Sequence, residues 1–179
     1  EQNDLSTTRV NLAGSSLSNT SALAFGGNQP ATAATEEWLG AGQPVGAWST
    51  GGSMNTAKKQ TAGAGGSSSD GLSFAGENSG TAFITDTETY NGTSWTEVNN
   101  MNTGRLLLAG TGHANTNALA TGGENGGGNV GNTETWNGTS WTEVADLNTA
   151  RRQLASSGAT NTAALAFGGA PGPTPTGLT

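Results

Sequence analysis

Charged side chains recur along this sequence at nearly constant spacing, and they are its first candidates for chemistry. A cation returns at intervals of 49, 47 and 46 residues, and a glutamate returns with it. The glutamates could line a carbohydrate or cation site, and the cations could line a central channel that recognises an acidic ligand. Residues repeated in every unit usually serve the unit itself, so we expect solvated glutamates on strands or turns. We expect each cation to pair with a carboxylate or to cap carbonyls of its own repeat. The residues are Glu36 or Glu37, Glu88 and Glu134, and Arg9, Lys58, Arg105 and Arg151.

Catalytic and metal-binding constellations are scarce. His113 is the single histidine and there is no cysteine. The sequence therefore offers no evident partners that would complete a Ser-His-Asp triad, a Cys-His pair or a metal site around His113. We expect His113 to be an ordinary histidine on a strand or at the surface. The glycine-rich stretch 122–128 lacks the following lysine and helix of a phosphate-binding loop. We therefore predict no catalytic, cofactor-binding or metal-binding residue, and no enzyme.

Composition excludes further classes of partner. The 179 residues carry a net charge of −7 and only six scattered Lys and Arg, which disfavours binding to nucleic acid or to an anionic membrane surface. No apolar run approaches the roughly 20 residues that a membrane-spanning helix needs. Thirty glycines and many Ala, Thr, Ser and Asn favour strands and turns over helices. The sequence predicts an all-β protein with antiparallel sheets.

The spacing of the charges belongs to an internal repeat. Segments 87–98 and 133–144 differ at one position in twelve, and Leu5, Met54, Met101 and Leu147 keep the same 49, 47 and 46 intervals. Each repeat reads as four short strands. The first follows the cation, as over 105–111. The second ends in a glycine pair, the third carries a Glu-x-aromatic element, and the fourth starts at a later Trp.

The connections between these strands differ in kind. Asn-Gly at 91–92 and 137–138 predicts a type I′ turn between strands three and four, and hence antiparallel hairpins instead of a parallel β-solenoid. The first repeat has no Asn-Gly there, and 41–47 lengthen its hairpin. Between strands two and three, the segments 28–35, 77–85 and 124–132 vary most and are expected to be exposed loops.

A diglycine after an apolar strand, then an aromatic residue, a Trp and an Arg resembles the kelch repeat. The resemblance implies a β-propeller, here partial, with about three and a half four-stranded blades. The repeats are approximately 4–52, 53–99, 100–145 and 146–179, the last one incomplete. Glycines would let backbones approach closely, and the aromatic rings would fill the space between blades. The matching residues are Gly26, Gly27, Gly76, Gly122, Gly123, Gly168 and Gly169, with aromatics Trp38, Trp48, Tyr90, Trp95, Trp136 and Trp141.

The Asn/Thr/Gly-rich form of these repeats resembles repeats in virion structural proteins of marine bacteriophages and in surface proteins of aquatic bacteria. This implies a non-enzymatic structural or interaction module on a virion or cell surface, such as a fibre, decoration or adhesion protein. A glycan or receptor would bind through the inter-strand loops. The alternatives are a carbohydrate-active propeller enzyme and an intracellular kelch adaptor that recruits a protein. Expected partners are other virion or surface subunits, the rest of a longer chain, or further copies in a homo-oligomer, with no cofactor.

Overall fold

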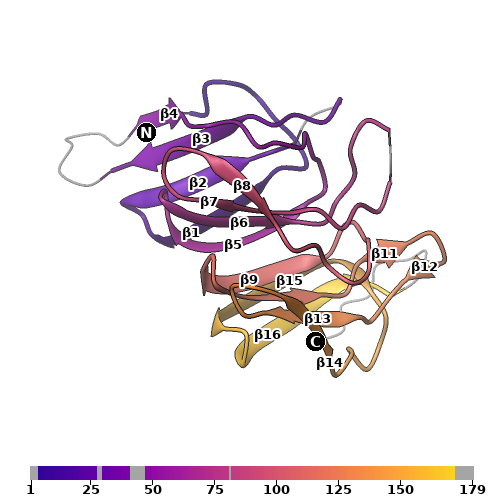
Figure 1. The fold of residues 1–179 in the computed structure, drawn as a ribbon. Coiled ribbons are helices and arrows are strands. Elements are labelled where there is room, and N and C mark those ends of the chain that lie inside the picture. The colour runs from indigo at the N-terminus through magenta and orange to yellow at the C-terminus, as the bar shows by residue number, and fades with distance from the viewer. Residues whose placement is uncertain (1–3, 28–29, 41–46, 81, 172–179) are drawn as a thin grey trace.

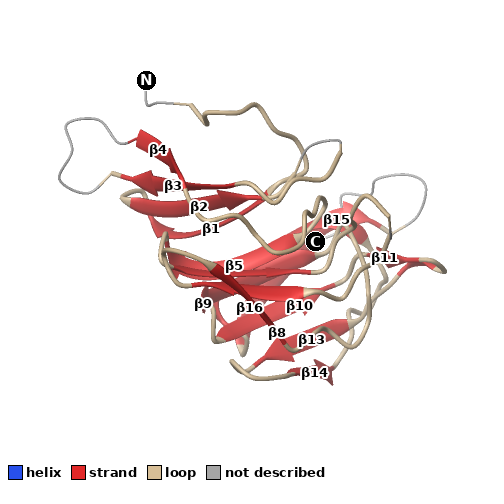
Figure 2. Cartoon of the chain, turned by 45° about the horizontal axis from the view of Figure 1, so that its top comes forward, coloured by secondary structure: helices blue, strands red, loops and turns tan. Residues whose placement is uncertain are grey.

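The computed structural model describes residues 4–27, 30–40, 47–80 and 82–171, and this part of the chain consists of strands and loops (Figure 1; Figure 2). Every strand pair is antiparallel, which confirms the all-β, antiparallel prediction. The first sheet contains β1 (Ala13–Ser18), β2 (Ser21–Phe25), β3 (Thr35–Leu39) and β4 (Ala47–Thr50). The second contains β5 (Ala62–Ser67), β6 (Asp70–Phe74), β7 (Thr87–Tyr90) and β8 (Trp95–Val98).

The third sheet repeats this order with β9 (Ala109–Ala114), β10 (Asn117–Thr121), β13 (Thr133–Trp136) and β14 (Trp141–Val144). A short hairpin, β11 (Glu124–Asn125) and β12 (Gly128–Asn129), lies in its variable loop. The fourth repeat contributes the long hairpin of β15 (Arg152–Thr160) and β16 (Ala163–Ala170). Four strands per repeat are thus confirmed for the first three repeats. No helix in the described ranges is available to cross a membrane.

In the first three repeats strand one begins later than the sequence predicts, whereas in the fourth β15 begins at Arg152, directly after the cation, as predicted. In the third repeat it starts at Ala109, four residues after Arg105, and Leu107 before it adopts a left-handed backbone with φ of 56°. The equivalent residues Asn11, Gln60 and Gln153 do the same, with φ of 56°, 53° and 55°. A left-handed conformation costs a non-glycine residue about 1–2 kcal/mol. It is retained in all four repeats, so the surrounding structure must offset it.

The offset comes from a chain of backbone hydrogen bonds that links the repeats. The amide of Gln60 donates to the carbonyl of Asn11 at 2.9 Å, Leu107 donates to Gln60 at 3.3 Å, and Gln153 donates to Leu107 at 2.8 Å. The left-handed residues therefore join each repeat to the next, and the first strands β1, β5, β9 and β15 lie side by side in chain order.

The predicted glycine pairs make a second bond across each of these joints. The second glycine donates to the carbonyl of the cation in the next repeat: Gly27 to Lys58 at 2.9 Å, Gly76 to Arg105 at 2.8 Å and Gly123 to Arg151 at 2.8 Å. A Cβ built on Gly26 would lie 2.8 Å from the Lys58 carbonyl, and φ at Gly26 is 69°. Close approach and a left-handed backbone thus both favour glycine, and the degenerate pair holds Ala75 in the same conformation, with φ of 61°.

Four of the predicted aromatics, Tyr90, Trp95, Trp136 and Trp141, are buried between neighbouring sheets, whereas Trp38 and Trp48 pack on each other in the first sheet and are only partly buried. Trp95 packs edge-on against Phe25 of the preceding sheet, with ring centroids 5.1 Å apart, and its indole Nε1 donates to Thr35 Oγ1 at 2.9 Å. Trp141 makes the same contacts with Phe74, at 4.9 Å, and with Thr87, at 3.0 Å. Tyr90 and Trp136 stack beside these indoles within their own sheets. Each buried ring contributes roughly 2–3 kcal/mol of transfer free energy.

The predicted type I′ turn is wrong. Gly138 has φ of 91°, but Asn137 does not share a positive φ, and β13 pairs with β14 up to Trp136 and Trp141, which leaves a four-residue loop. The Asn137 side chain explains the difference, because its Oδ1 accepts the amides of Thr139 and Ser140, each at 2.9 Å. Asn91 makes the equivalent pair of bonds, at 3.0 Å each. A local side-chain acceptor has replaced the tighter turn.

We expect Asn137→Ala to lower the free energy of unfolding by about 1–2 kcal/mol, because two loop amides lose their acceptor. Asn137→Asp keeps both acceptor positions and is the matched control, expected to stay close to the parent. Chemical denaturation of the three proteins measures the difference. Equal losses in the two variants would show that the Asn side chain contributes through something other than its carbonyl oxygen.

Candidate functional site

The repeated charges form buried ion pairs inside the sheets. Arg105 lies between the glycine pair and β13, where its guanidinium contacts Glu134 Oε1 at 3.0 Å, and both side chains are at most 1% exposed. Arg105 also donates to the carbonyls of Gly122, at 3.0 Å, and Asn132. Glu134 Oε2 accepts the backbone and side-chain amides of Asn102, both at 2.8 Å. Both members of the pair therefore have further hydrogen-bond partners, but Arg105 Nε is buried with no such partner in the described part of the chain.

The same arrangement occurs in the first two repeats. Lys58 Nζ lies 3.1 Å from Glu88 Oε1 with both side chains fully buried, and Arg9 pairs with Glu36. The backbone amide and the side-chain amide of Asn55 bind Glu88 as Asn102 binds Glu134. In the fourth repeat, Arg151 donates to the carbonyl of Gly168 at 3.0 Å, as Arg105 does to Gly122.

These pairs decide between the two interpretations of the charges. The prediction that each cation pairs with a carboxylate or caps carbonyls of its own repeat is confirmed. The prediction that the glutamates are solvated is wrong, because Glu36, Glu88 and Glu134 are at most 3% exposed. They sit on β3, β7 and β13, on the side facing the segment that carries the cation. The sequence signal for this pairing is that a cation and a glutamate recur together at nearly the same spacing.

Burial perturbs the ionisation of the cations. It lowers the pKa of Lys58 and of Arg105, and attraction to Glu88 and Glu134 respectively counteracts part of that effect. Truncating one member of such a pair leaves the other charge buried without compensation, which typically costs 3–5 kcal/mol. These charges therefore act on the stability of each sheet.

Acid should weaken the first repeat through Glu36. Burial alone raises the pKa of Glu36, but hydrogen bonds from Ser6 and Arg9 with attraction to Arg9 outweigh it, so the pKa lies below 4.5. The stabilisation is thus complete above the unfolded pKa of about 4.5 and is lost as pH falls through the lower folded value. Between pH 5 and pH 2.5, we expect the unfolding free energy of Glu36→Gln to depend less on pH than that of the parent, by at most about 1.4 kcal/mol per pH unit. Parallel slopes in urea denaturation would contradict this expectation.

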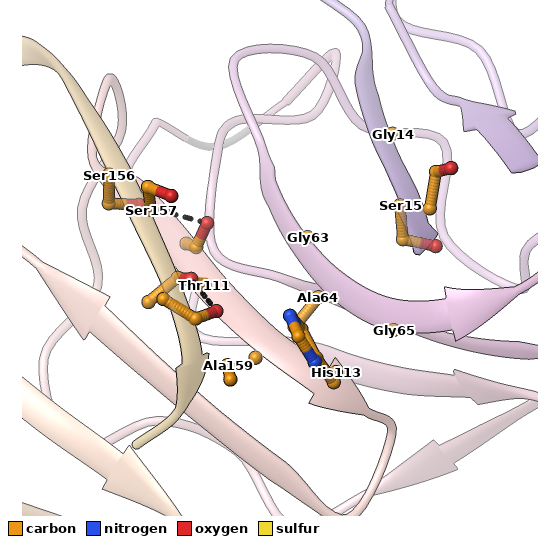
Figure 3. Close-up of a pocket in the computed structure, with 14 residues that line it drawn as sticks. Gly14, Ser15, Gly63, Ala64, Gly65, Thr111, His113, Ser156, Ser157 and Ala159 are labelled. Carbon is orange, nitrogen blue, oxygen red and sulfur yellow. Dashed lines mark hydrogen bonds between the residues drawn. The ribbon is translucent and has the colours of Figure 1, made fainter. Parts of the chain in front are cut away.

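A central groove lies where the first strands of all four repeats meet (Figure 3). Its volume is about 380 Å³, and its walls come from 14–16, 63–65, 110–113 and 156–159. The walls are mostly backbone and small side chains. Thr111 Oγ1 donates to the Gly158 carbonyl at 2.9 Å and Ser156 Oγ donates to the Gly110 carbonyl at 3.0 Å, so these hydroxyls join β9 to β15.

His113 lies on β9 at this groove and is exposed, as predicted for a strand or surface histidine. The groove lining contains no carboxylate to orient its imidazole. Within the described residues, no three His, Cys, Asp or Glu side chains come close enough to share a metal ion. His113 therefore has no chemistry that its described neighbours support.

A second candidate surface is the edge formed by the strand two–three loops, which project on one side of the molecule (Figure 1). Phe83 in this edge has φ of 61°, which is a genuine outlier for a bulky residue, and its side chain is only partly buried. A Cβ built on Gly126, in the β11–β12 hairpin of the next repeat, would lie 3.9 Å from the Phe83 ring. The ring thus lies beside the neighbouring loop.

Sequence reasoning missed Phe83 because it has no counterpart in the other repeats. The strain at this position is a reason to consider function, since residues in sparsely populated backbone regions cluster at binding sites. Below it, a Cβ on Gly104 would overlap the Phe83 carbonyl, so the loop lies tightly against the segment between β8 and β9. The base of the next loop is fixed similarly, by an ion pair between Arg152 and Glu124. We define the loop edge as Phe83 together with Glu124–Asn129.

The chain matches no protein-family model and no curated protein. What it does is therefore inferred from its own residues: repeated charges buried in ion pairs, a groove of small residues, and the loop edge.

Proposed function

We propose that this chain is a non-enzymatic structural and recognition module of a virion or cell surface, built as part of a kelch-type β-propeller. The observation that carries the proposal is the fate of the repeated charges. All three glutamates and their cations are consumed in ion pairs that hold each sheet together. A catalytic carboxylate needs access to substrate, and these have none.

Recognition is assigned to the loop edge, where sequence varies between repeats and the repeat symmetry is broken. Phe83 offers a rigid, partly exposed ring, and an aromatic face suits the C–H face of a sugar. Asn125 and Asn129 lie on β11 and β12 of the neighbouring hairpin. Asn125 Oδ1 accepts the amide of Gly127 and Asn129 Nδ2 donates to the carbonyl of Ala170, so the Asn125 Nδ2 and Asn129 Oδ1 atoms are the groups proposed to bond hydroxyls. A surface glycan or glycosylated receptor is the ligand class that fits this combination.

The test is binding of the whole chain to a glycan array and to isolated bacterial envelope fractions. Phe83→Gly removes the ring and relieves the positive φ, so we expect at least tenfold weaker binding without loss of thermal stability. Phe83→Tyr keeps the ring and should retain binding. No binding of the parent chain to any array or envelope component would contradict the recognition role. Sugar release during the assay would contradict the non-enzymatic role and favour a carbohydrate-active enzyme.

A further inference from the structure

Each of the first two joints between neighbouring repeats has two unlike halves. The earlier repeat supplies a phenylalanine, and the later repeat supplies a Trp and a glycine on its first strand. Phe25 packs on Trp95, and a Cβ on Gly63 would lie 2.5 Å from the Phe25 ring. Phe74 packs likewise on Trp141, and a Cβ on Gly110 would lie 2.7 Å from its ring. Both phenylalanines are fully buried by these contacts.

The fourth repeat presents the first half of this joint uncovered. Leu165 and Phe167 on β16 are 64% and 39% exposed, whereas their equivalents Leu23 and Phe25 are 2% and 0% exposed. Gly168 also lacks a neighbour: a Cβ built on it meets nothing within 4 Å. At the equivalent Gly122, a Cβ would meet the carbonyl of Arg151 in the following repeat. An apolar face that is buried elsewhere is therefore open here.

The first repeat presents the second half. A Cβ on Gly14 would meet only the carbonyl of Leu23 in its own sheet, so the ring that covers Gly63 and Gly110 has no counterpart here. Trp48 is only partly buried, whereas Trp95 and Trp141 are 5% and 6% exposed. This face lacks a phenylalanine, and the fourth repeat offers one.

The backbone hydrogen-bonding groups of the first and fourth repeats are complementary in the same way as their side chains. Amides of the left-handed residues donate backwards along the chain, from Gln60 to Asn11, from Leu107 to Gln60 and from Gln153 to Leu107. If the series continued by one step, the amide of Asn11 from a further copy of the chain would donate to the carbonyl of Gln153. Similarly, the series of glycine amides on cation carbonyls would continue from Gly169 to an Arg9. The surroundings of Gly169 already match those of Gly123. A Cβ on Gly169 would meet the carbonyl of Arg152 and the side chain of Leu154, and a Cβ on Gly123 would meet the equivalent Leu106 and Leu108.

We propose that the β1–β4 sheet of a second copy of this chain docks on the β15–β16 hairpin and forms a fourth joint of the same kind. Phe167 then packs on Gly14 and Trp48 of the second copy. Because each copy carries both halves, the contact is head to tail, and it either closes a ring or grows into a filament. Two copies would bring eight first strands together, within the four to eight sheets of known propellers. The inference rests on the proposed scaffold role, but it is measured by association, not by ligand binding.

The experiment is sedimentation velocity of the full chain at about 1–100 μM, with four single variants. The parent should self-associate. Phe167→Glu removes one half of the joint and Trp48→Glu the other, so each variant alone should be monomeric. Leu165→Glu is a second variant of the same face as Phe167, and its 64% exposure makes a folding defect a poor explanation for any loss. Val144→Glu, at a 41% exposed apolar residue on β14 of the third sheet, is the matched control and should associate as the parent does.

Mixing the two disabled variants gives the decisive result. Phe167→Glu keeps an intact β1–β4 face and Trp48→Glu keeps an intact β15–β16 face, so a 1:1 mixture should form a dimer and nothing larger. A parent that stays monomeric at 100 μM would overturn the proposal and favour further repeats or a different protein as the occupant. A parent that associates while the mixture does not would overturn it as well, because like faces would then be meeting. Neither result depends on whether the loop edge binds a glycan.

Discussion

Glu134→Gln is expected to lower the free energy of unfolding by about 3–5 kcal/mol, a large part of the 5–15 kcal/mol typical of a domain. The substitution leaves the Arg105 guanidinium fully buried without its counter-charge, since the remaining Arg105 contacts are to the carbonyls of Gly122 and Asn132. Urea denaturation followed by tryptophan fluorescence measures the loss, because Trp136 and Trp141 lie in the same sheet.

Glu143→Gln is the matched control, because Glu143 lies directly opposite Glu134 in the β13–β14 pairing but is exposed. Its effect should stay within about 0.5 kcal/mol. Replacing both members of the pair, as Arg105→Met with Glu134→Leu, should recover part of the loss, because no buried charge then remains. Equal effects at Glu134 and Glu143 would mean that burial of the ion pair is irrelevant to stability.

Gly63→Ser should destabilise the chain by about 1–3 kcal/mol through overpacking at the first joint. The new Cβ would lie 2.5 Å from the Phe25 ring, and Phe25 is fully buried. Phe25→Thr alone should cost about 3–5 kcal/mol, because it opens a cavity between the sheets. The unfolding free energies of both single variants are measured by chemical denaturation.

The double variant is the informative member of this set. The third joint already carries this combination naturally, with Thr121 where the other repeats have phenylalanine and Ser156 where they have glycine. There, Ser156 Oγ donates to the Gly110 carbonyl at 3.0 Å. We therefore expect Phe25→Thr with Gly63→Ser to cost at least 1 kcal/mol less than the sum of the single changes. Strict additivity would show that the ring and the glycine are not coupled.

The repeat made much of the fold predictable, because hydrophobic and glycine landmarks that return in step reveal strands even where each strand is only four to six residues long. Strand pairing within a repeat followed from the short connections. The starts of the first strands in the first three repeats did not, since nothing in the residue types at positions 11, 60 and 107 indicates a left-handed backbone. That conformation depends on bonds to the neighbouring repeat, which are non-local. Closure into a propeller remains a prediction.

The candidate sites also include some that the sequence predicts and some that it does not. The ion pairs were within reach of sequence reasoning, because Arg105 and Glu134 recur together with Lys58 and Glu88 at one spacing. Their burial was missed, since an isolated glutamate on a short strand is usually solvated. Phe83 was out of reach, because its significance lies in a backbone angle and in a neighbour from another repeat. Side-chain contacts that cross from one repeat to the next carry no signature in either repeat alone.

Trp95 and Trp141 each pack against the phenylalanine of the preceding sheet, so the stability of one sheet depends on its neighbours. Each sheet relies on its neighbours for the cover of its aromatic residues, so opening should begin at the two end units and advance inward, as in a one-dimensional chain of coupled elements. Amides of β5, β6, β9 and β10 would then exchange with solvent most slowly, and those of β4 and β16 most rapidly. Binding of another subunit to either end face would slow amide exchange throughout the array. Assembly would therefore raise the local stability of every sheet.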